Sequence, residues 1–339
     1  MSLIEFRTEG IYIPRADVFI DPWKRVKKAL ITHGHSDHSR WGHHSYLCTH
    51  QSKPIIRHRL GNINIQSVAF GEEVNINGVK FTFFPAGHIV GSAQIKVEYK
   101  GEIWVISGDY KIENDGISGL FEPVKCHRFV TECTFGLPIY SWVPQESIFN
   151  QINKWWQHNQ ENETTTLLTG YTLGKAQRLL AGVDSSIGPI YVHGAIENMN
   201  AVIKSCGVQL PDTIHLTPDV PKSDLAKALV LAPSGSTGTG WMRQFKEVSI
   251  GNASGWMQLR GARRRGGADR GFALSDHADW EGLNWAVKQT GAERVYVTHG
   301  YTDIFCRWLQ SEGFNAEVVK TQYEGELSEE SNMSSEVDD

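Results

Sequence analysis

The feature that most constrains this chain is a run of three histidines and one aspartate within six positions. The run is Thr32-His33-Gly34-His35-Ser36-Asp37-His38, and its histidines come directly after the short apolar run 29–32. Runs this short, rich in β-branched and apolar residues, predict buried strands. Imidazole and carboxylate are the ligands that zinc takes when thiolates are absent, and a loop after a strand can turn four side chains towards one point. The sequence therefore favours a metal site over a solvent-exposed histidine-rich turn.

Three further candidate ligands, His88, Asp109 and His299, each follow an apolar run of their own. A residue in that position emerges at the end of a strand, where a sheet presents its binding sites. The seven candidates are too many for one tetrahedral ion but suit two ions. We expect one ion to be bound by His33, His35 and His88 and the other by Asp37, His38 and His299, with Asp109 between them.

Two cations in one site predict a type of chemistry. Divalent metals about 4 Å apart can hold a bridging hydroxide as nucleophile and stabilise charge that develops on a phosphoryl oxygen. The sequence thus predicts hydrolysis by a hydroxide that two metals activate. Zinc is favoured for a histidine-rich site, and manganese is the alternative.

The pattern of apolar residues changes near residue 145. Before it, short apolar runs separated by Asn77-Gly78 and Lys100-Gly101 predict a strand-rich, meander-like part with β-hairpins. After it, helical and strand-like segments alternate, which indicates an α/β layer with a parallel sheet. We expect helices at 144–156, 173–183, 195–206, 279–289 and 302–312, strands at 164–169, 189–193, 272–275 and 316–320, and loops at 233–240 and 251–271.

Composition bounds the class of protein and its compartment. The five cysteines are scattered and never spaced as C-x-x-C, which predicts neither disulfides nor a thiolate zinc site and fits a reducing compartment. No stretch approaches the roughly 20 apolar residues of a membrane span, and the first ten residues lack the apolar core of a signal peptide. We therefore expect a cytoplasmic protein that does not associate with a membrane.

Charge is unevenly distributed along the chain. The formal net charge is -5, but residues 324–339 carry seven acids and no base, which leaves +2 on the rest. That end is also rich in serine, so we expect residues 323–339 to form an acidic, disordered tail. An anionic substrate is therefore compatible with the body of the chain.

The candidate ligands belong to an ordered series of motifs that also includes Asp21, Glu132 and His277. This series resembles that of the β-CASP nucleases, a branch of the metallo-β-lactamase superfamily, over residues 10 to 320. The four motifs shared by the lactamase fold are matched by Asp21, the run 33–38, His88 in 86–93 and Asp109 in 107–110. The three motifs of the β-CASP branch are matched by Glu132 in 131–136, His277 in 274–280 and His299 in 297–300.

Within that branch the chain is most similar to the bacterial ligase-associated DNA exonucleases, through the stretches 170–178, 191–195 and 254–279. The resemblance implies an α/β protein, a metallo-β-lactamase αββα sandwich with an inserted α/β β-CASP cap domain and the active site in the cleft between. It places the lactamase-fold domain at 1–145 and 272–322 and the cap at 146–271. It also implies a functional partnership with a DNA ligase and a helicase.

Proton transfer needs groups besides the metal ligands. Phosphodiester cleavage releases an alkoxide, so an acid positioned near the leaving oxygen helps. His277 is the candidate, and the resemblance puts Glu132 beside it, where a carboxylate would fix the tautomer and favour the protonated form. Asp37 could also accept a proton from the attacking water. Asp21 follows an apolar run and precedes Pro22, so we expect it to brace the ligand loop by hydrogen bonds.

Candidate substrate contacts lie upstream of His277. Guanidinium groups match phosphate geometry, and a basic cluster is formed by Arg260, Arg263, Arg264, Arg265 and Arg270. Trp256 and Trp241 could stack on an unpaired base, and Ser234 opens a Gly-rich turn that could present amides to phosphate. The alternative is that the arginines form a solvated face and the tryptophans are core residues.

The sequence favours a DNA exonuclease that acts on single-stranded or frayed ends in DNA repair, because a cleft under a cap admits one strand more readily than a helix. A histidine at the third β-CASP motif is typical of RNA-cutting members, so His299 favours an RNA nuclease as the alternative. The same metal core would serve a small-molecule hydrolase such as a thioesterase or lactonase, against which the arginine cluster argues. A non-catalytic subunit would have lost ligands, and none is lost.

Overall fold

The structure is a computed structural model, and it describes residues 2–259 and 267–322. By its internal contacts the chain divides at 141/142 and 276/277 into unit 1, formed by the two outer segments, and unit 2, formed by the segment between them. The domain limits predicted from the sequence are 145/146 and 271/272. The predicted tail, 323–339, lies outside the described residues.

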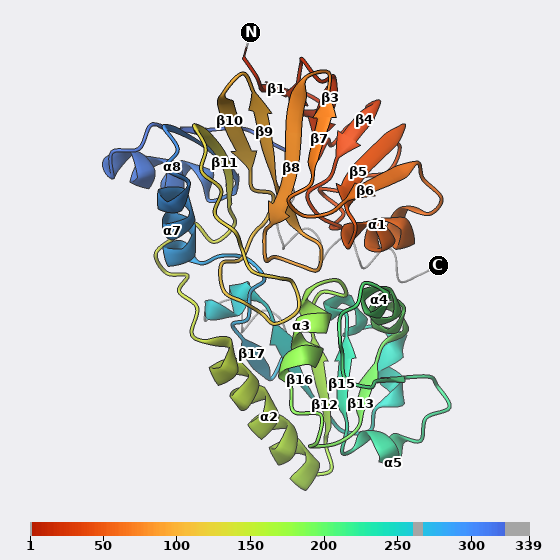
Figure 1. Cartoon of the computed structure of the whole chain (residues 1–339). Coiled ribbons are helices and arrows are strands. Elements are labelled where there is room, and N and C mark those ends of the chain that lie inside the picture. The colour runs from red at the N-terminus through yellow and green to blue at the C-terminus, as the bar shows by residue number, and fades with distance from the viewer. Residues whose placement is uncertain (1, 260–266, 323–339) are drawn as a thin grey trace. The chain divides into compact units, whose positions relative to one another are not determined.

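The first sheet of unit 1 has six strands in chain order (Figure 1). They are β1 (Glu5–Arg7), β2 (Gly10–Ile13), β3 (Val18–Ile20), β4 (Lys28–Leu30), β5 (Ser45–Thr49) and β6 (Ile65–Val68). The pairs from β1 to β3 are antiparallel, but those from β3 to β6 are parallel. The expected meander is therefore wrong for this half of the sheet. Helix α1 (Ser52–Leu60) makes the crossover between β5 and β6.

The second sheet of unit 1 has seven strands in the order β19-β18-β11-β10-β9-β8-β7. They are β7 (Glu73–Ile76), β8 (Val79–Pro85), β9 (Ala93–Tyr99), β10 (Glu102–Ile106), β11 (Arg128–Cys133), β18 (Arg294–Gly300) and β19 (Ala316–Val318). The predicted hairpins are confirmed, because antiparallel β7–β8 and β9–β10 turn at Asn77-Gly78 and Lys100-Gly101. All four turn residues have positive φ, as the tight turns that match strand twist require.

Unit 1 is an αββα sandwich. Its main core lies between the two sheets and includes the fully buried Phe81 and Phe83, each worth about 1.5–3 kcal/mol on burial. Helices α7 (Trp280–Thr290) and α8 (Thr302–Ser311) cover the outer face of the second sheet through residues such as Leu283 and Phe305 (Figure 1). Helix α1 packs on the first sheet through Ile56.

Unit 2 is an α/β layer around one sheet of six strands, all parallel, in the order β14-β13-β15-β12-β16-β17. The strands are β12 (Thr165–Thr169), β13 (Ile190–Val192), β14 (Ile214–His215), β15 (Leu229–Ala232), β16 (Val248–Ala253) and β17 (Arg270–Phe272). The helices are α2 (Gln145–Glu161), α3 (Lys175–Gly182), α4 (Gly194–Ser205) and α5 (Lys222–Leu225), with short 3-10 turns η1 (Ser234–Ser236), η2 (Gly240–Gln244) and η3 (Gly255–Gln258). The expected parallel sheet is confirmed.

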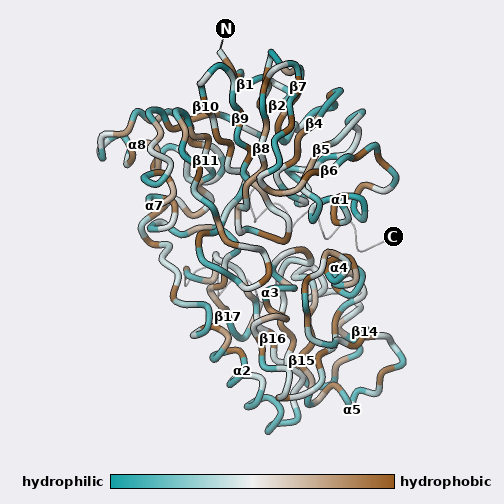
Figure 2. Tube along the Cα trace, viewed as in Figure 1, coloured by the Kyte–Doolittle hydropathy of each residue, from teal (hydrophilic) through white to brown (hydrophobic). Residues whose placement is uncertain are grey.

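Helix α2 shows why this part of the chain forms a layer. Hydrophobic and hydrophilic residues are interspersed along it (Figure 2), and its buried side chains include Ile152, Trp155 and Trp156. These residues pack on the sheet beside Leu168 of β12. The helix therefore buries one face and leaves the other to solvent.

Strand β16 corrects a sequence prediction, because residues from 251 onwards were expected to form a loop. Gly251 suggested a loop, yet it lies in a strand between β12 and β17. A Cβ at Gly251 would lie 2.6 Å from the ring of Trp155, so glycine is needed for the ring of α2 to reach the sheet.

In the part of the chain that the structure describes, no helix is long and apolar enough to cross a membrane.

Candidate metal centre

The histidine-rich loop leaves the end of β4, and Asp21 holds it in place. The fully buried Asp21 carboxylate accepts hydrogen bonds from the Thr32 amide at 2.8 Å and the Thr32 hydroxyl at 2.5 Å. The same carboxylate lies 2.8 Å from Nδ1 of His38. With Nδ1 of His38 engaged, Nε2 of that ring is directed towards the other candidate ligands, 3.4 Å from Asp109.

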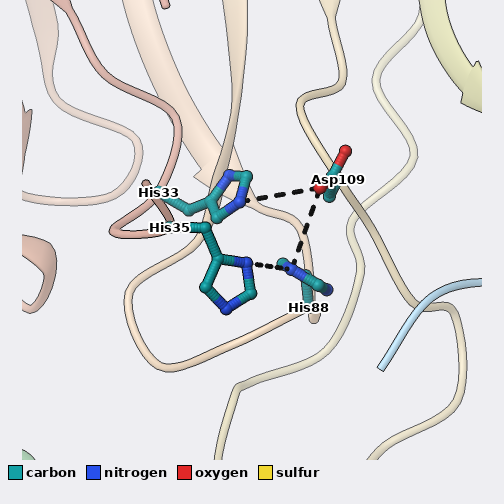
Figure 3. Close-up of side chains that lie close together, drawn as sticks. All are labelled: His33, His35, His88 and Asp109. Carbon is teal, nitrogen blue, oxygen red and sulfur yellow. Dashed lines mark hydrogen bonds and ion pairs between the residues drawn. The ribbon is translucent and has the colours of Figure 1, made fainter. Parts of the chain in front are cut away.

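Asp109 lies at the centre of the cluster. Its Oδ2 is 3.6 Å from Nε2 of His33 and 4.0 Å from Nε2 of His88, as Figure 3 shows. The rings of His88 and His35 meet at 3.0 Å between Nε2 and Nδ1. These four residues offer ligand atoms that all lie within 4.8 Å of one another.

The other oxygen of Asp109 faces a second group. Oδ1 lies 3.6 Å from Nδ1 of His299, and His38, Asp109 and His299 together form another set of close ligand atoms. Asp37 joins through Oδ2, which is 3.5 Å from Nε2 of His38. The seven predicted ligands are therefore brought together from the ends of β4, β8, β10 and β18, with Asp109 shared between two groups.

The donor set fits divalent cations. Nε2 of His33 and Oδ1 of Asp109 are buried and make no hydrogen bond to any described residue. Such atoms cost free energy unless a partner, here a cation, satisfies them. Imidazole nitrogens with carboxylate oxygens are the donor types that zinc binds in catalytic sites.

Charge at the cluster also calls for a cation. Burial, with His38 nearby, lowers the pKa of His33 well below its ordinary value of 6.5, so this ring is neutral. Burial would also lower the pKa of His38, but Asp37 and Asp109 outweigh it and raise that pKa well above 6.5. Burial acts to raise the pKa of Asp109, while His38 and His299 bring it well below 3.8. The negative charges of Asp37 and Asp109 therefore stabilise positive charge in this buried cluster.

Glycine at position 108 lets the loop after β10 reach the ligand loop. Gly108 has φ +55, and a Cβ there would lie 2.7 Å from both Cβ and the hydroxyl of Thr32. Any other residue would push Asp109 away from the cluster. His299 itself has φ 59, a left-handed conformation that is uncommon outside glycine and is often found where a site demands it.

His277 and Glu132 lie beside the ligands as a pair. Nδ1 of His277 is 2.9 Å from Oε1 of Glu132, and both side chains are almost fully buried. The ring of His277 lies 4.5 Å from that of His88 between centroids. The pairing that the family resemblance implied is therefore present in the structure.

Several supporting residues were missed by the sequence reasoning. Nη1 of Arg59 in α1 donates to the carbonyl of Gly34 and the hydroxyl of Ser39, both at 2.8 Å, and so holds the ligand loop. The hydroxyl of Thr134 donates to Glu132 at 2.5 Å. The only signal for Thr134 was a small polar residue near the end of a strand, and nothing local marked Arg59.

The predicted substrate contacts that the structure describes lie in unit 2. Arg260, Arg263, Arg264 and Arg265 fall outside the described residues, whereas Arg270 is exposed at the start of β17. Ser234 opens η1 directly after β15, and Trp256 lies half-buried in η3 directly after β16. Trp241 packs against His193 with 5.2 Å between ring centroids. The substrate roles of these residues stay predictions.

Comparison with known proteins shows which proteins this chain is similar to. No family model matches the chain. Nearly the whole chain, 94%, aligns at 28% identity with 31% of a protein named probable DNA ligase from Opitutus terrae. A segment of 54% aligns at 26% identity with 46% of an RNase J-like protein from Methanocaldococcus jannaschii, and 49% aligns at 27% identity with 23% of endoribonuclease YSH1 from Mycosarcoma maydis. These matches show that the chain is similar to the β-CASP nucleases of the metallo-β-lactamase superfamily.

The lengths of these relatives and a similar solved structure complete the comparison. The chain spans less than half the length of each of these three relatives. A crystal structure of a protein of unknown function from Enterococcus faecalis V583 is similar with a TM-score of 0.59 over 88% of this chain and 80% of that one, at 10% identity. That likeness shows the fold alone.

Proposed function

We propose that this protein is a metal-dependent nuclease that hydrolyses phosphodiester bonds. The observation that carries the proposal is the set of seven candidate ligands with Asp109 at its centre, all buried except the half-buried His35, and with His277 beside it. His33, His35 and His88 would hold one divalent cation and Asp37, His38 and His299 the other, with zinc as first choice and manganese as second. When bound, the cations would polarise the phosphoryl group and supply a nucleophile at neutral pH.

The protein's own groups would manage the proton. Because Nδ1 of His277 is engaged by Glu132 at 2.9 Å, Nε2 is the atom that would carry the proton to the leaving oxygen. Glu132 would favour the protonated ring. Asp37 would accept the proton that the attacking water loses.

The preferred substrate in this proposal is DNA, cut from single-stranded or frayed ends. Support comes from the match of 94% of the chain within a protein named probable DNA ligase, which also suits a partnership with a ligase. The proposed partnership with a helicase rests on the family resemblance alone. RNA is the second candidate, favoured by His299 and by relatives named RNase J-like protein and endoribonuclease.

One assay separates these substrates. The purified protein, with its metal content measured, is incubated with matched single strands of DNA and RNA, labelled at either end. We expect DNA to be degraded from one end and the Asp109→Ala variant to be inactive, because this change removes the carboxylate shared by both groups. Cleavage of RNA alone would favour the second candidate, and a metal-loaded protein that cuts neither would exclude both.

A further inference from the structure

A basic surface of unit 1 takes no part in the metal centre. Four cations occupy five consecutive positions, and all four residues are exposed: Lys24, Arg25, Lys27 and Lys28. None of these side chains forms an ion pair with any residue in the described ranges 2–259 and 267–322. Four neighbouring charges without partners repel one another, so this surface favours an anionic ligand.

An exposed tryptophan adjoins the four cations. Trp41 is 63% exposed, and the guanidinium of Arg25 lies 5.0 Å from the centroid of its ring. The two segments are fastened together because the amides of His44 and Ser45 donate to the carbonyls of Val26 and Lys27, at 3.1 and 3.0 Å. These hydrogen bonds between the two segments keep the four cations close to the tryptophan ring.

The surface is hollowed rather than flat. A hollow of about 570 Å³ is lined by Arg25, Lys27 and Lys28 together with Arg7, and also by the two acids Glu9 and Asp17. The charge of Asp17 is partly engaged, because it accepts a hydrogen bond from the hydroxyl of Tyr12 at 2.9 Å. Arg7 is also engaged, because it forms an ion pair with Glu5 at 2.7 Å, so the three cations of the segment 25–28 face two acids on this wall.

We propose that the basic patch, defined as Lys24, Arg25, Lys27, Lys28 and Trp41, binds a single-stranded part of the nucleic-acid substrate, away from the end that reacts. Cations that track a phosphate backbone next to an aromatic ring that stacks on bases are the two components of single-strand binding surfaces. The inference rests on the proposed nuclease function, since it concerns the same substrate.

Strand β4 sets the distance between the patch and the metal centre. Lys28 begins this strand and His33 lies five positions later, beyond its end, which corresponds to at most about 17 Å at about 3.3 Å per residue. At the axial rise of about 3.4 Å per nucleotide in a stacked strand, a bound strand covers this distance with about five nucleotides, and a more extended strand needs fewer. The patch should therefore act on long substrates and not on very short ones.

The test replaces Lys24, Arg25, Lys27 and Lys28 together by alanine. Its matched control replaces Lys100, Lys125, Lys288 and Arg307, which are also exposed in unit 1 and also comprise three lysines and one arginine. Binding of a fluorescent single-stranded DNA of about 20 nucleotides is measured by anisotropy at several salt concentrations, in the Asp109→Ala background so that no cleavage occurs. Circular dichroism checks that both variants fold.

We expect the patch variant to bind at least tenfold more weakly and to lose about 3 from the slope of log affinity against log salt, since each phosphate contact contributes about 0.7. The control should change neither quantity as much, and Trp41→Ala should weaken binding without changing the slope. With the Asp109 carboxylate restored, the patch variant should cleave a fragment of about two nucleotides at the wild-type rate but show a raised KM on long strands.

Equal losses in patch variant and control would overturn the inference, because charge alone would then explain binding. Equal loss of cleavage on short and long strands would also overturn it. Neither result would touch the proposed function, which fails only if the wild-type protein cleaves neither length. Normal DNA binding by the patch variant would overturn the inference as well.

Discussion

Two buried carboxylates near the site have different surroundings and therefore different roles. Both oxygens of Asp109 face histidine rings, and Oδ1 makes no hydrogen bond to a described residue. Glu132 is instead satisfied by protein donors. Its Oε1 accepts from the Tyr110 amide and lies 2.9 Å from His277, while its Oε2 accepts from the amide and hydroxyl of Thr134. A carboxylate with this many donors is suited to hold His277 rather than a metal.

A substitution can show whether His277 acts as a proton donor or as a metal ligand. We predict that His277→Ala lowers kcat by about 10²- to 10⁴-fold and leaves the bound metal unchanged, because the ring would donate a proton and not bind the cation. Activity on end-labelled DNA and metal content by mass spectrometry are the two measurements. His88→Ala is the matched control, and it should lose metal as well as activity.

Glu132→Gln completes the same experiment. It keeps the size of the side chain but not its charge, so it should lower kcat less than His277→Ala. In the double variant the two losses should not add, because Glu132 would act through His277. Metal loss in His277→Ala, or fully additive effects, would show that the pair is not an acid with its positioning residue.

The clustering of the candidate ligands could be predicted from the sequence because the run 33–38, His88, Asp109 and His299 each follow an apolar run, which is a local pattern. Their supports could not. Thr32 binds a carboxylate 11 residues earlier in the chain, and Arg59 reaches the carbonyl of Gly34 from a helix that the apolar pattern did not predict. Contacts of this kind depend on the packing of elements, which single-sequence patterns do not contain.

At the scale of elements, two cations of helix α3 form ion pairs with the segment that follows β17. The ammonium of Lys175 lies 2.9 Å from one oxygen of Asp276, and the guanidinium of Arg178 lies 3.2 Å from the other and also donates to the carbonyl of Ser275. All three charged side chains are at most 4% exposed. Residue 276 directly precedes His277, so these ion pairs hold the chain in place where it leaves unit 2.

Breaking this buried cluster should destabilise the protein. We predict that Asp276→Ala lowers the free energy of unfolding by about 3–5 kcal/mol, because Lys175 and Arg178 would stay buried without their carboxylate. Denaturant unfolding followed by circular dichroism measures the loss. Asp212→Ala, an exposed change in the same unit, should stay within about 0.5 kcal/mol. A loss for Asp276→Ala no greater than that of the control would mean that the cluster contributes no net stability.

Helices and strands with a clear period of apolar residues could be predicted from the sequence. The residues at which they begin and end were predicted less well. Helix α2 was expected to end near residue 156 but runs to Glu161, and the strand expected at 272–275 is β17 at Arg270–Phe272. Strand β16 was missed because Gly251 looks like a turn residue, whereas its missing side chain accommodates Trp155 from α2. The parallel pairing in the first sheet was missed because the connection through α1 lacks a strong apolar period.

At the scale of the whole molecule, all seven candidate ligands come from unit 1, and they come from both of its sheets. His33, His35, Asp37 and His38 follow β4 of the first sheet, whereas His88, Asp109 and His299 come from the second. A cation bound by both groups would therefore connect the two layers of the sandwich. None of the described residues of unit 2 belongs to these ligand groups.

This arrangement predicts where metal removal is felt. A ligand that binds only the folded state stabilises it by about 2.7 kcal/mol at one hundred times its dissociation constant. We predict that a chelator lowers the protection of amides against hydrogen exchange in β4, β8, β10 and β18 and leaves β12, β13 and β15 unchanged. Hydrogen exchange with mass spectrometry resolves these peptides, and re-added zinc should restore protection in the wild type but not in Asp109→Ala. Uniform loss of protection in both units would contradict a site built from unit 1 alone, because the cations would then also stabilise a sheet that supplies none of the seven ligands.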